Sequence, residues 1–177
     1  MPTTYQLIAL AACSLAVAGA ARDAATPVSD AVRSAAGRAE KNFIAAAEAM
    51  PAGKYGFKPT AAQMTFGGVI AHMSGGNDAL CSGIGGVPAP KRPELGAGAS
   101  KEQLVARLRE TFQFCETALS KVNDSRLGGM VPYFSGEVSQ AAAMVAAAEE
   151  WAGHYSQIAV YLRLNGLLPP TARPNPA

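Results

Sequence analysis

The chain has 177 residues, and 49% of them are hydrophobic, which is enough apolar material for one domain with a substantial core. Its 15 basic and 13 acidic residues are spread along the sequence and give a net charge of +2 at pH 7. Because the sequence has no block of Lys and Arg and no basic stripe with aromatic residues, we expect no nucleic-acid partner. Abundant alanine and few aromatic residues favour close-packed helices over a β-sandwich.

The first segment differs from the rest of the chain. Residues 7–20 form an uncharged run that ends in Ala18-Gly19-Ala20, the small-residue pattern that signal peptidase cuts. A stable membrane span needs about 20 apolar residues, so this run is too short to provide one. We therefore predict that residues 1–20 are a signal peptide and that the protein is exported, either periplasmic or secreted, although the first six residues lack Lys and Arg. A lipoprotein anchored at Cys13 is the alternative.

The first two helices are predicted from hydrophobic periodicity. Apolar residues at intervals of three and four predict helix one over residues 29–50, where a Pro and a Gly follow. Helix two is predicted to begin near Thr60 or Thr65 and to extend to about Ile84.

Helix two contains one of the two histidines in the chain, His72. A lone histidine in an apolar run is more often a hydrogen-bonded core residue than a metal ligand. Gly75 and Gly76 follow one turn later, and each disfavours a helix interior by about 1 kcal/mol relative to alanine. They indicate either close helix packing or room left for a ligand.

A long connection follows helix two. Residues 83–99 are rich in Gly and Pro, whereas connections between antiparallel helices of a bundle usually have about 2–8 residues. This length predicts an overhand crossover that makes helices two and three parallel. A mobile substrate lid is the competing interpretation.

Helix three opens with a capping box, Ser100 to Gln103, and is predicted to end at residues 123–124. Cys81 lies late in helix two and Cys115 late in helix three, so parallel helices place both thiols at the same end of the bundle. In an exported protein this favours a disulfide between them, and two unpaired core cysteines are the alternative.

Residues 127–136 are predicted to be a loop, and helix four to span residues 137–165, before a disordered tail at 169–177. Helix four is apolar almost all round, which is typical of a buried helix. Its Glu150 and His154 are four residues apart and share one face. Because a buried carboxylate needs a partner, these two residues and His72 form a candidate metal site if helices two and four pack side by side.

Two stretches resemble the DinB-like family: Thr65-Phe66-Gly67-Gly68-Val69-Ile70-Ala71-His72 and the segment from His154 to Pro170. The resemblance covers about residues 29–170, with the domain itself placed at 29–168. It implies an all-α, up-down-down-up four-helix bundle that holds a divalent metal, often zinc or nickel, through one histidine of helix two and two of helix four. His72 and His154 match that pattern, but Glu150 replaces the middle histidine. This change either preserves a site suited to zinc, iron or manganese or records a weakened one.

The resemblance implies a metal-dependent enzyme of transferase or hydrolase type that acts on an unknown small molecule. Gln157 and Tyr155 are then expected to support the ligands or line the pocket, with plain packing as the alternative. The other function considered is a non-catalytic, exported helical-bundle binding protein with a degenerate metal site. Exposed apolar surface on a bundle permits a homodimer, but the sequence carries no specific signal for one.

Overall fold

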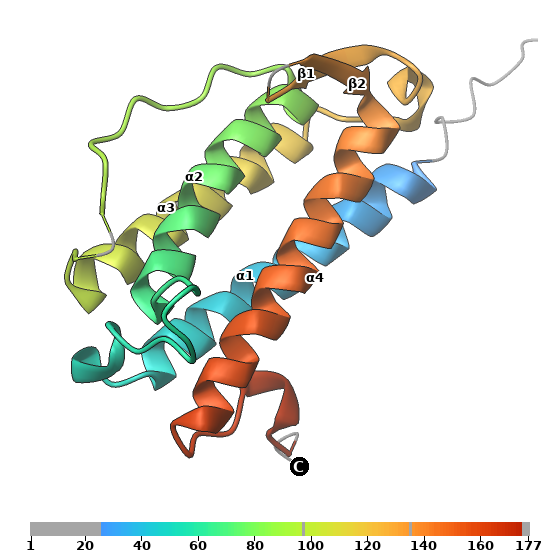
Figure 1. The fold of residues 1–177 in the computed structure, drawn as a ribbon. Helices are drawn as coiled ribbons and strands as arrows, with labels where there is room; N and C mark the ends of the chain where they lie inside the picture. Colours follow the sequence, from blue (N-terminus) through green and yellow to red (C-terminus); the bar gives the residue numbers. More distant parts are fainter. Residues whose placement is uncertain (1–25, 97, 135, 175–177) are drawn as a thin grey trace, which may run out of the picture.

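A computed structural model describes residues 26–96, 98–134 and 136–174. Four helices form a bundle: α1 (Pro27–Ala49), α2 (Phe66–Gly85), α3 (Lys101–Leu119) and α4 (Gln140–Leu164). Both α1 and α2 pack against α3 and α4, so α1 and α2 occupy opposite corners of the bundle. Figure 1 shows α1 and α4 running in one direction and α2 and α3 in the other. The predicted up-down-down-up bundle is confirmed.

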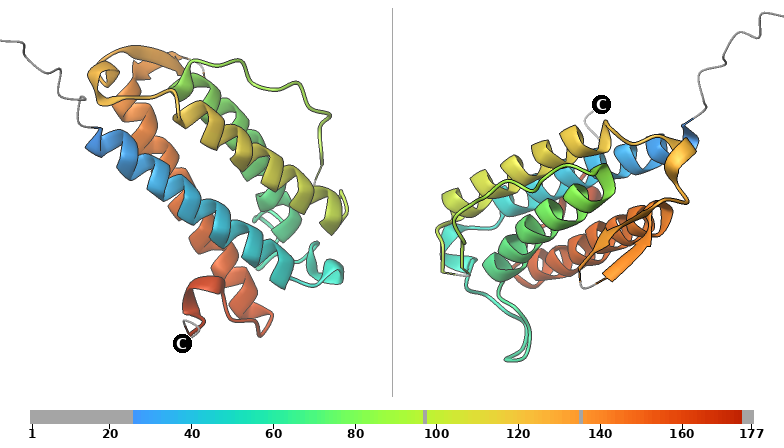
Figure 2. Two further views of the ribbon diagram at one scale, coloured as in Figure 1. Left: turned by 180° about the vertical axis from the view of Figure 1, so that it is seen from behind. Right: turned by 90° about the horizontal axis from the view of Figure 1, so that it is seen from above.

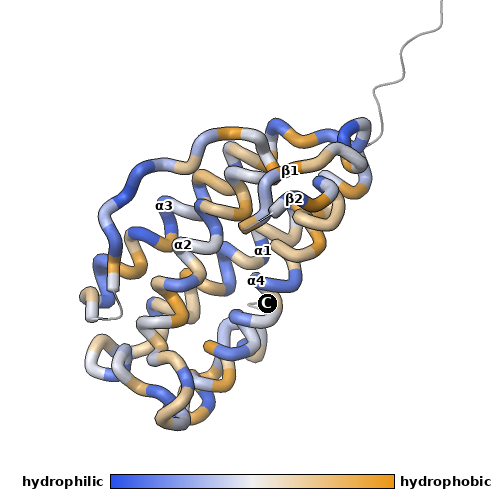
Figure 3. The backbone as a smooth tube through the Cα atoms, turned by 45° about the horizontal axis from the view of Figure 1, so that its top comes forward, coloured by the Kyte–Doolittle hydropathy of each residue, from blue (hydrophilic) through white to orange (hydrophobic). Residues whose placement is uncertain are grey.

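The connection between α2 and α3 runs along the outside of the bundle for most of its length (Figures 1 and 2). It is strongly hydrophilic over part of its path (Figure 3). Arg92 fastens it to both helices, because Nε donates to Asp78 Oδ2 of α2 at 2.8 Å and Nη1 donates to Glu110 Oε2 of α3 at 2.9 Å. The connection is therefore the predicted crossover, and α2 and α3 are parallel.

Cys81 and Cys115 form a disulfide that joins α2 to α3, with the two Cα atoms 5.1 Å apart. Both residues are fully buried in the core. The predicted pairing agrees with this arrangement because the crossover brings the late turns of both helices to one end of the bundle.

Several helix ends are fixed by side chains. Thr65 caps α2, its hydroxyl accepting from the Gly68 N–H at 3.0 Å, which selects the later of the two predicted starts. Ser100 and Gln103 make both hydrogen bonds of the predicted capping box. Lys101 Nζ donates to the carbonyls of Glu48 and Met50 at the end of α1, so α3 begins where α1 stops.

Residues 127–139 were predicted as a loop and the first turn of helix four, and this prediction is wrong. They contain an antiparallel hairpin, β1 (Met130–Tyr133) and β2 (Gly136–Ser139), and α4 begins only at Gln140. The hairpin lies directly on α2, where a Cβ added to Gly83 would be 2.4 Å from the Pro132 carbonyl oxygen. Strands of four residues, one with a central Pro, give little periodic signal, and packing on α2 stabilises them.

The described residues also contain three short 3₁₀ helices: η1 (Ala52–Lys54), η2 (Asp124–Arg126) and η3 (Pro170–Ala172). Helix α3 ends at Leu119, earlier than predicted, and Asp124 of η2 instead caps α1, accepting from the Val28 and Ser29 N–H groups at 2.9 Å each. This side chain thus joins two segments that are distant in sequence.

The tail was predicted to be disordered from residue 169, but its first part is ordered. Helix η3 is held to α4 because the Thr171 N–H donates to the Tyr155 hydroxyl at 3.2 Å. The predicted signal peptide at 1–20, the lipoprotein cysteine Cys13 and residues 175–177 lie outside the described residues. Among the described residues, no helix is long and apolar enough to cross a membrane.

Candidate metal centre

The three candidate ligands meet between two neighbouring helices. His72 lies in the second turn of α2, and Glu150 and His154 lie one turn apart on α4. One ligand atom from each residue lies within 4.8 Å of the other two. The two imidazole rings are 4.8 Å apart between centroids and tilted by 68°. The structure therefore brings together the set that the sequence predicted, and His72 is exposed rather than part of the core.

A chain of hydrogen bonds orients the His154 ring. The Tyr161 hydroxyl donates to the Met64 carbonyl at 3.0 Å and accepts from Gln157 Nε2 at 3.1 Å. Gln157 therefore turns its oxygen, Oε1, toward His154 Nδ1 at 3.1 Å. Because an amide oxygen only accepts, Nδ1 must carry the proton, and in the neutral ring Nε2 keeps its lone pair.

His154 Nε2 faces Glu150 Oε2 at a distance of 3.1 Å. In the neutral tautomer this places a nitrogen lone pair against a carboxylate, and both atoms are electron-rich. Only a cation between or beside them relieves the repulsion, either a proton on Nε2 or a metal ion. The third donor atom, from His72, lies within 4.8 Å of both, so a small rotation of the side chains brings all three around one ion.

The donor chemistry and burial fit a divalent metal. Two imidazoles and one carboxylate suit zinc, iron or manganese. The His154 side chain is 20% exposed and the Glu150 side chain 41%, so the centre lies at the surface and is open to small molecules. Beside it is a hollow of about 370 Å³ lined by His72, Glu150, Gly75, Gly76 and Phe134, among others.

A buried amide sets the packing of the helices that carry the donors. Trp151, next to Glu150, donates from Nε1 to Asn77 Oδ1 at 2.8 Å. Asn77 Nδ2 in turn donates to Thr111 Oγ1 of α3 at 3.3 Å. Asn77 is fully buried and joins three helices, so it fixes how α4 is rotated against α2. The sequence did not lead us to predict a role for Asn77. The available signal was an amide side chain in the apolar helix two and the single Trp of the chain in helix four.

The two residues predicted to support the ligands lie in different places. Gln157 contacts His154, as described above. Tyr155 points to the other side of α4, where its ring packs edge-on against Phe43 of α1 at 5.8 Å and its hydroxyl is 3.1 Å from Thr171 Oγ1. Tyr155 thus packs α4 against α1 and the tail, which is the alternative role considered for it.

Comparison with known proteins concerns the family and the fold. A sequence model of the DinB superfamily matches residues 35–158, a range that includes all three candidate ligands. A crystal structure of a DinB-like protein, YjoA of Bacillus subtilis, superposes with a TM-score of 0.62 at 16% sequence identity, covering 77% of this chain and 92% of that chain. At this identity the likeness concerns the fold alone. A search of curated proteins found no match.

Proposed function

Because the chain belongs to the DinB superfamily, we propose that it binds one divalent metal ion through His72, Glu150 and His154 and is a metal-dependent enzyme of transferase or hydrolase type. The observation that carries this proposal is the approach of His154 Nε2 to Glu150 Oε2, with Nδ1 held by Gln157. A histidine that only filled space would not need its second nitrogen fixed in this way.

The protein residues account for binding and access. His154 presents Nε2, Glu150 presents one carboxylate oxygen, and His72 contributes the donor from α2. When bound, the metal supplies a Lewis acid with positions left open for a substrate donor, because the protein offers three ligands. The hollow beside the donors holds the rest of a small substrate.

Metal analysis of tag-free protein tests the proposal. The protein is dialysed separately against zinc, nickel, iron(II) and manganese. We expect the wild type to retain about one equivalent of at least one of these metals and His154→Ala to retain none. Glu150→Gln should weaken binding, because the amide has no charge. Glu149→Gln is the matched control, since the neighbouring glutamate is exposed and lies outside the donor set, and it should bind metal as the wild type does.

Absence of bound metal from the wild type, or equal binding by His154→Ala, would contradict the proposal. The non-catalytic binding protein would then remain.

Export is part of the proposal. The buried disulfide supports it, because such bonds persist in oxidising compartments and are rare in the cytosol. N-terminal sequencing of protein from the native source should find a chain that begins after Ala20, and thiol titration without reductant should find no reactive pair. An intact N-terminus together with three free thiols, those of Cys13, Cys81 and Cys115, would contradict export.

A further inference from the structure

Gly75 and Gly76 leave a bare strip on α2 beside His72. A Cβ built on either glycine meets no atom within 4 Å apart from its own helix backbone and chain neighbours. Close helix packing, one of the two explanations open from the sequence, therefore does not account for them. The other explanation, room for a ligand, agrees with the structure.

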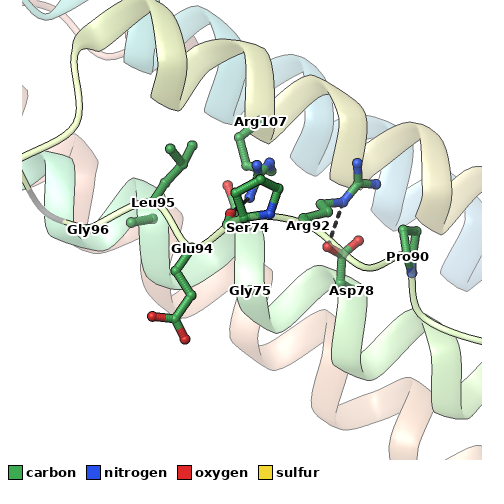
Figure 4. A pocket seen from close by; sticks show the side chains of 11 residues that line it. Ser74, Gly75, Asp78, Pro90, Arg92, Glu94, Leu95, Gly96 and Arg107 are labelled. Carbon is green, nitrogen blue, oxygen red and sulfur yellow. Dashed lines mark hydrogen bonds and ion pairs between the residues drawn. The ribbon is translucent and has the colours of Figure 1, made fainter.

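Two hollows flank this strip. The first is the one of about 370 Å³ beside the metal donors. The second, of about 330 Å³, lies under the crossover between α2 and α3 (Figure 4). Ala71 and Gly75 line both hollows, so the two are neighbours on α2, and we refer to them together as the groove. His72 and Asp78 are six residues apart in α2, so they are separated by about 9 Å along the helix axis. The groove extends at least over this distance.

The end of the groove under the crossover contains two polar atoms without hydrogen-bond partners. These are Asp78 Oδ1, an acceptor, and Arg107 Nε, a donor, and both atoms are buried. Asp78 uses its other oxygen for Arg92, as Figure 4 shows. Arg107 donates from Nη1 to the Pro93 carbonyl, and its Nε is 3.4 Å from Glu110 Oε2 without forming a hydrogen bond. Buried polar atoms without partners are rare in folded proteins, so this pair indicates a group still to be bound.

Side chains of both charges meet at this end. Asp78 and Glu94 line it together with Arg92 and Arg107, and Glu110 of α3 forms ion pairs with both arginines. A simple anion or a simple cation is therefore not favoured. A group that carries both charges matches the acceptor of Asp78 and the donor Nε of Arg107, neither of which has a hydrogen-bond partner among the described residues.

We propose that this groove binds the organic part of the substrate, and that the substrate carries an adjacent ammonium and carboxylate, as an α-amino acid does. The zwitterion lies under the crossover, its ammonium toward Asp78 and its carboxylate toward Arg107. The substrate's chain crosses Gly75, and its far end reaches the metal donors. The metal end of this assignment rests on the proposed function.

Two small chelators test the groove in zinc-loaded protein by isothermal titration calorimetry. The δ-hydroxamate of L-2-aminoadipate carries the zwitterion, and pentanohydroxamate is the same chain without it. We expect the zwitterionic probe to bind about tenfold more tightly, since hydrogen bonds to charged groups contribute that much. Gly75→Leu should abolish the preference by filling the groove, and Arg107→Lys should reduce it by removing Nε. Both variants should bind zinc as the wild type does.

Gly37→Leu is the matched control for Gly75→Leu. Gly37 is also a helical glycine with open space around its Cβ position, but it lies on α1, outside both hollows. It should keep the full preference. Equal binding of the two probes by the wild type, or a preference that survives Gly75→Leu, would overturn the proposal.

An experiment without metal distinguishes failure of the metal site from failure of the groove. If the wild type binds no zinc, the proposed function fails, and the groove is tested by NMR of metal-free protein with L-2-aminoadipate and with pentanoate. In the wild type, we expect L-2-aminoadipate but not pentanoate to shift the amide signals of Ala71 and Gly75. In Gly75→Leu, we expect addition of L-2-aminoadipate to cause no shift. Absence of shifts in the wild type would overturn the groove as well.

Discussion

At the scale of single residues, the orientation of His154 depends on atoms well away from the metal donors. The Met64 carbonyl holds the Tyr161 hydroxyl, the hydroxyl orients the Gln157 amide, and the amide holds His154 Nδ1. This chain of contacts begins in the loop before α2 and ends on α4. The loop therefore determines which ring nitrogen of His154 is available to a metal.

Replacing Gln157 tests this dependence. Gln157→Leu keeps the size of the side chain but removes the acceptor for Nδ1, so His154 is free to adopt the other tautomer. We expect metal affinity to fall by about 10- to 100-fold, measured by competition with a chromogenic chelator. Ser156→Ala is the control, because the Ser156 hydroxyl bonds only to the Ala152 carbonyl of its own helix and should leave the affinity unchanged. Unchanged affinity in Gln157→Leu would show that the contact is not needed.

Asp124 gives the fold a defined dependence on acid. Desolvation opposes its ionisation, but hydrogen bonds from the Ser29 hydroxyl and from the N–H groups of Val28 and Ser29, with Arg33 nearby, outweigh this and lower the pKa of the carboxyl below 3.8. A pKa lowered in the folded state contributes stability that is fully present above the unfolded value, about 3.9, and is lost as the pH falls through the folded value.

Urea unfolding at pH 7 and pH 3 measures this contribution. We expect Asp124→Asn to be less stable than the wild type at pH 7, and the difference between them to shrink at pH 3. A difference that is the same at both pH values would contradict a role for the ionised carboxylate.

At the scale of elements, the glycines of α2 have opposite roles. Gly85 lies against α3, where a Cβ would be 2.5 Å from the Ala118 carbonyl oxygen, whereas Gly76 has open space. The first glycine permits close approach of two helices, whereas the second leaves open space beside the metal donors at a cost in helix stability.

Alanine substitution separates these roles. Gly85→Ala should destabilise the protein by about 1–3 kcal/mol because α3 must shift. Gly76→Ala should stabilise it by up to about 1 kcal/mol, the difference in helix propensity. Chemical denaturation followed by circular dichroism compares the two, and a stabilised Gly85→Ala would show that α2 and α3 do not pack as described.

The sequence predicted those elements whose signals are local. Ser100 and Gln103 mark the start of α3 within four residues, and the spacing of Glu150 and His154 places them on one face before any packing is known. The hairpin, the capping of α1 by Asp124 and the polar atoms under the crossover depend on partners distant in sequence. Arg92, for example, contacts side chains 14 and 18 residues away, and no periodicity reports such contacts.

At the scale of the whole molecule, the disulfide limits how far the chain can open. It closes a loop between residues 34 apart in sequence, which in the chain-entropy account contributes roughly 3–4 kcal/mol by restricting the unfolded state. We expect the double variant Cys81→Ser/Cys115→Ser to lose stability of this order. Urea unfolding of the wild type with and without reductant provides the comparison, and identical curves would show that no bond forms.

The placement of the donors has a mechanical consequence. Two of them sit on one turn of α4 and the third on α2, so an ion bound there adds a tie between α2 and α4, which are joined by hydrogen bonds and packing but, within the described residues, by no covalent cross-link. Withdrawing the ion should leave three helices joined much as before and let α4 separate first. Deuterium uptake on chelation should then rise along the boundary between α2 and α4 and stay flat between α2 and α3.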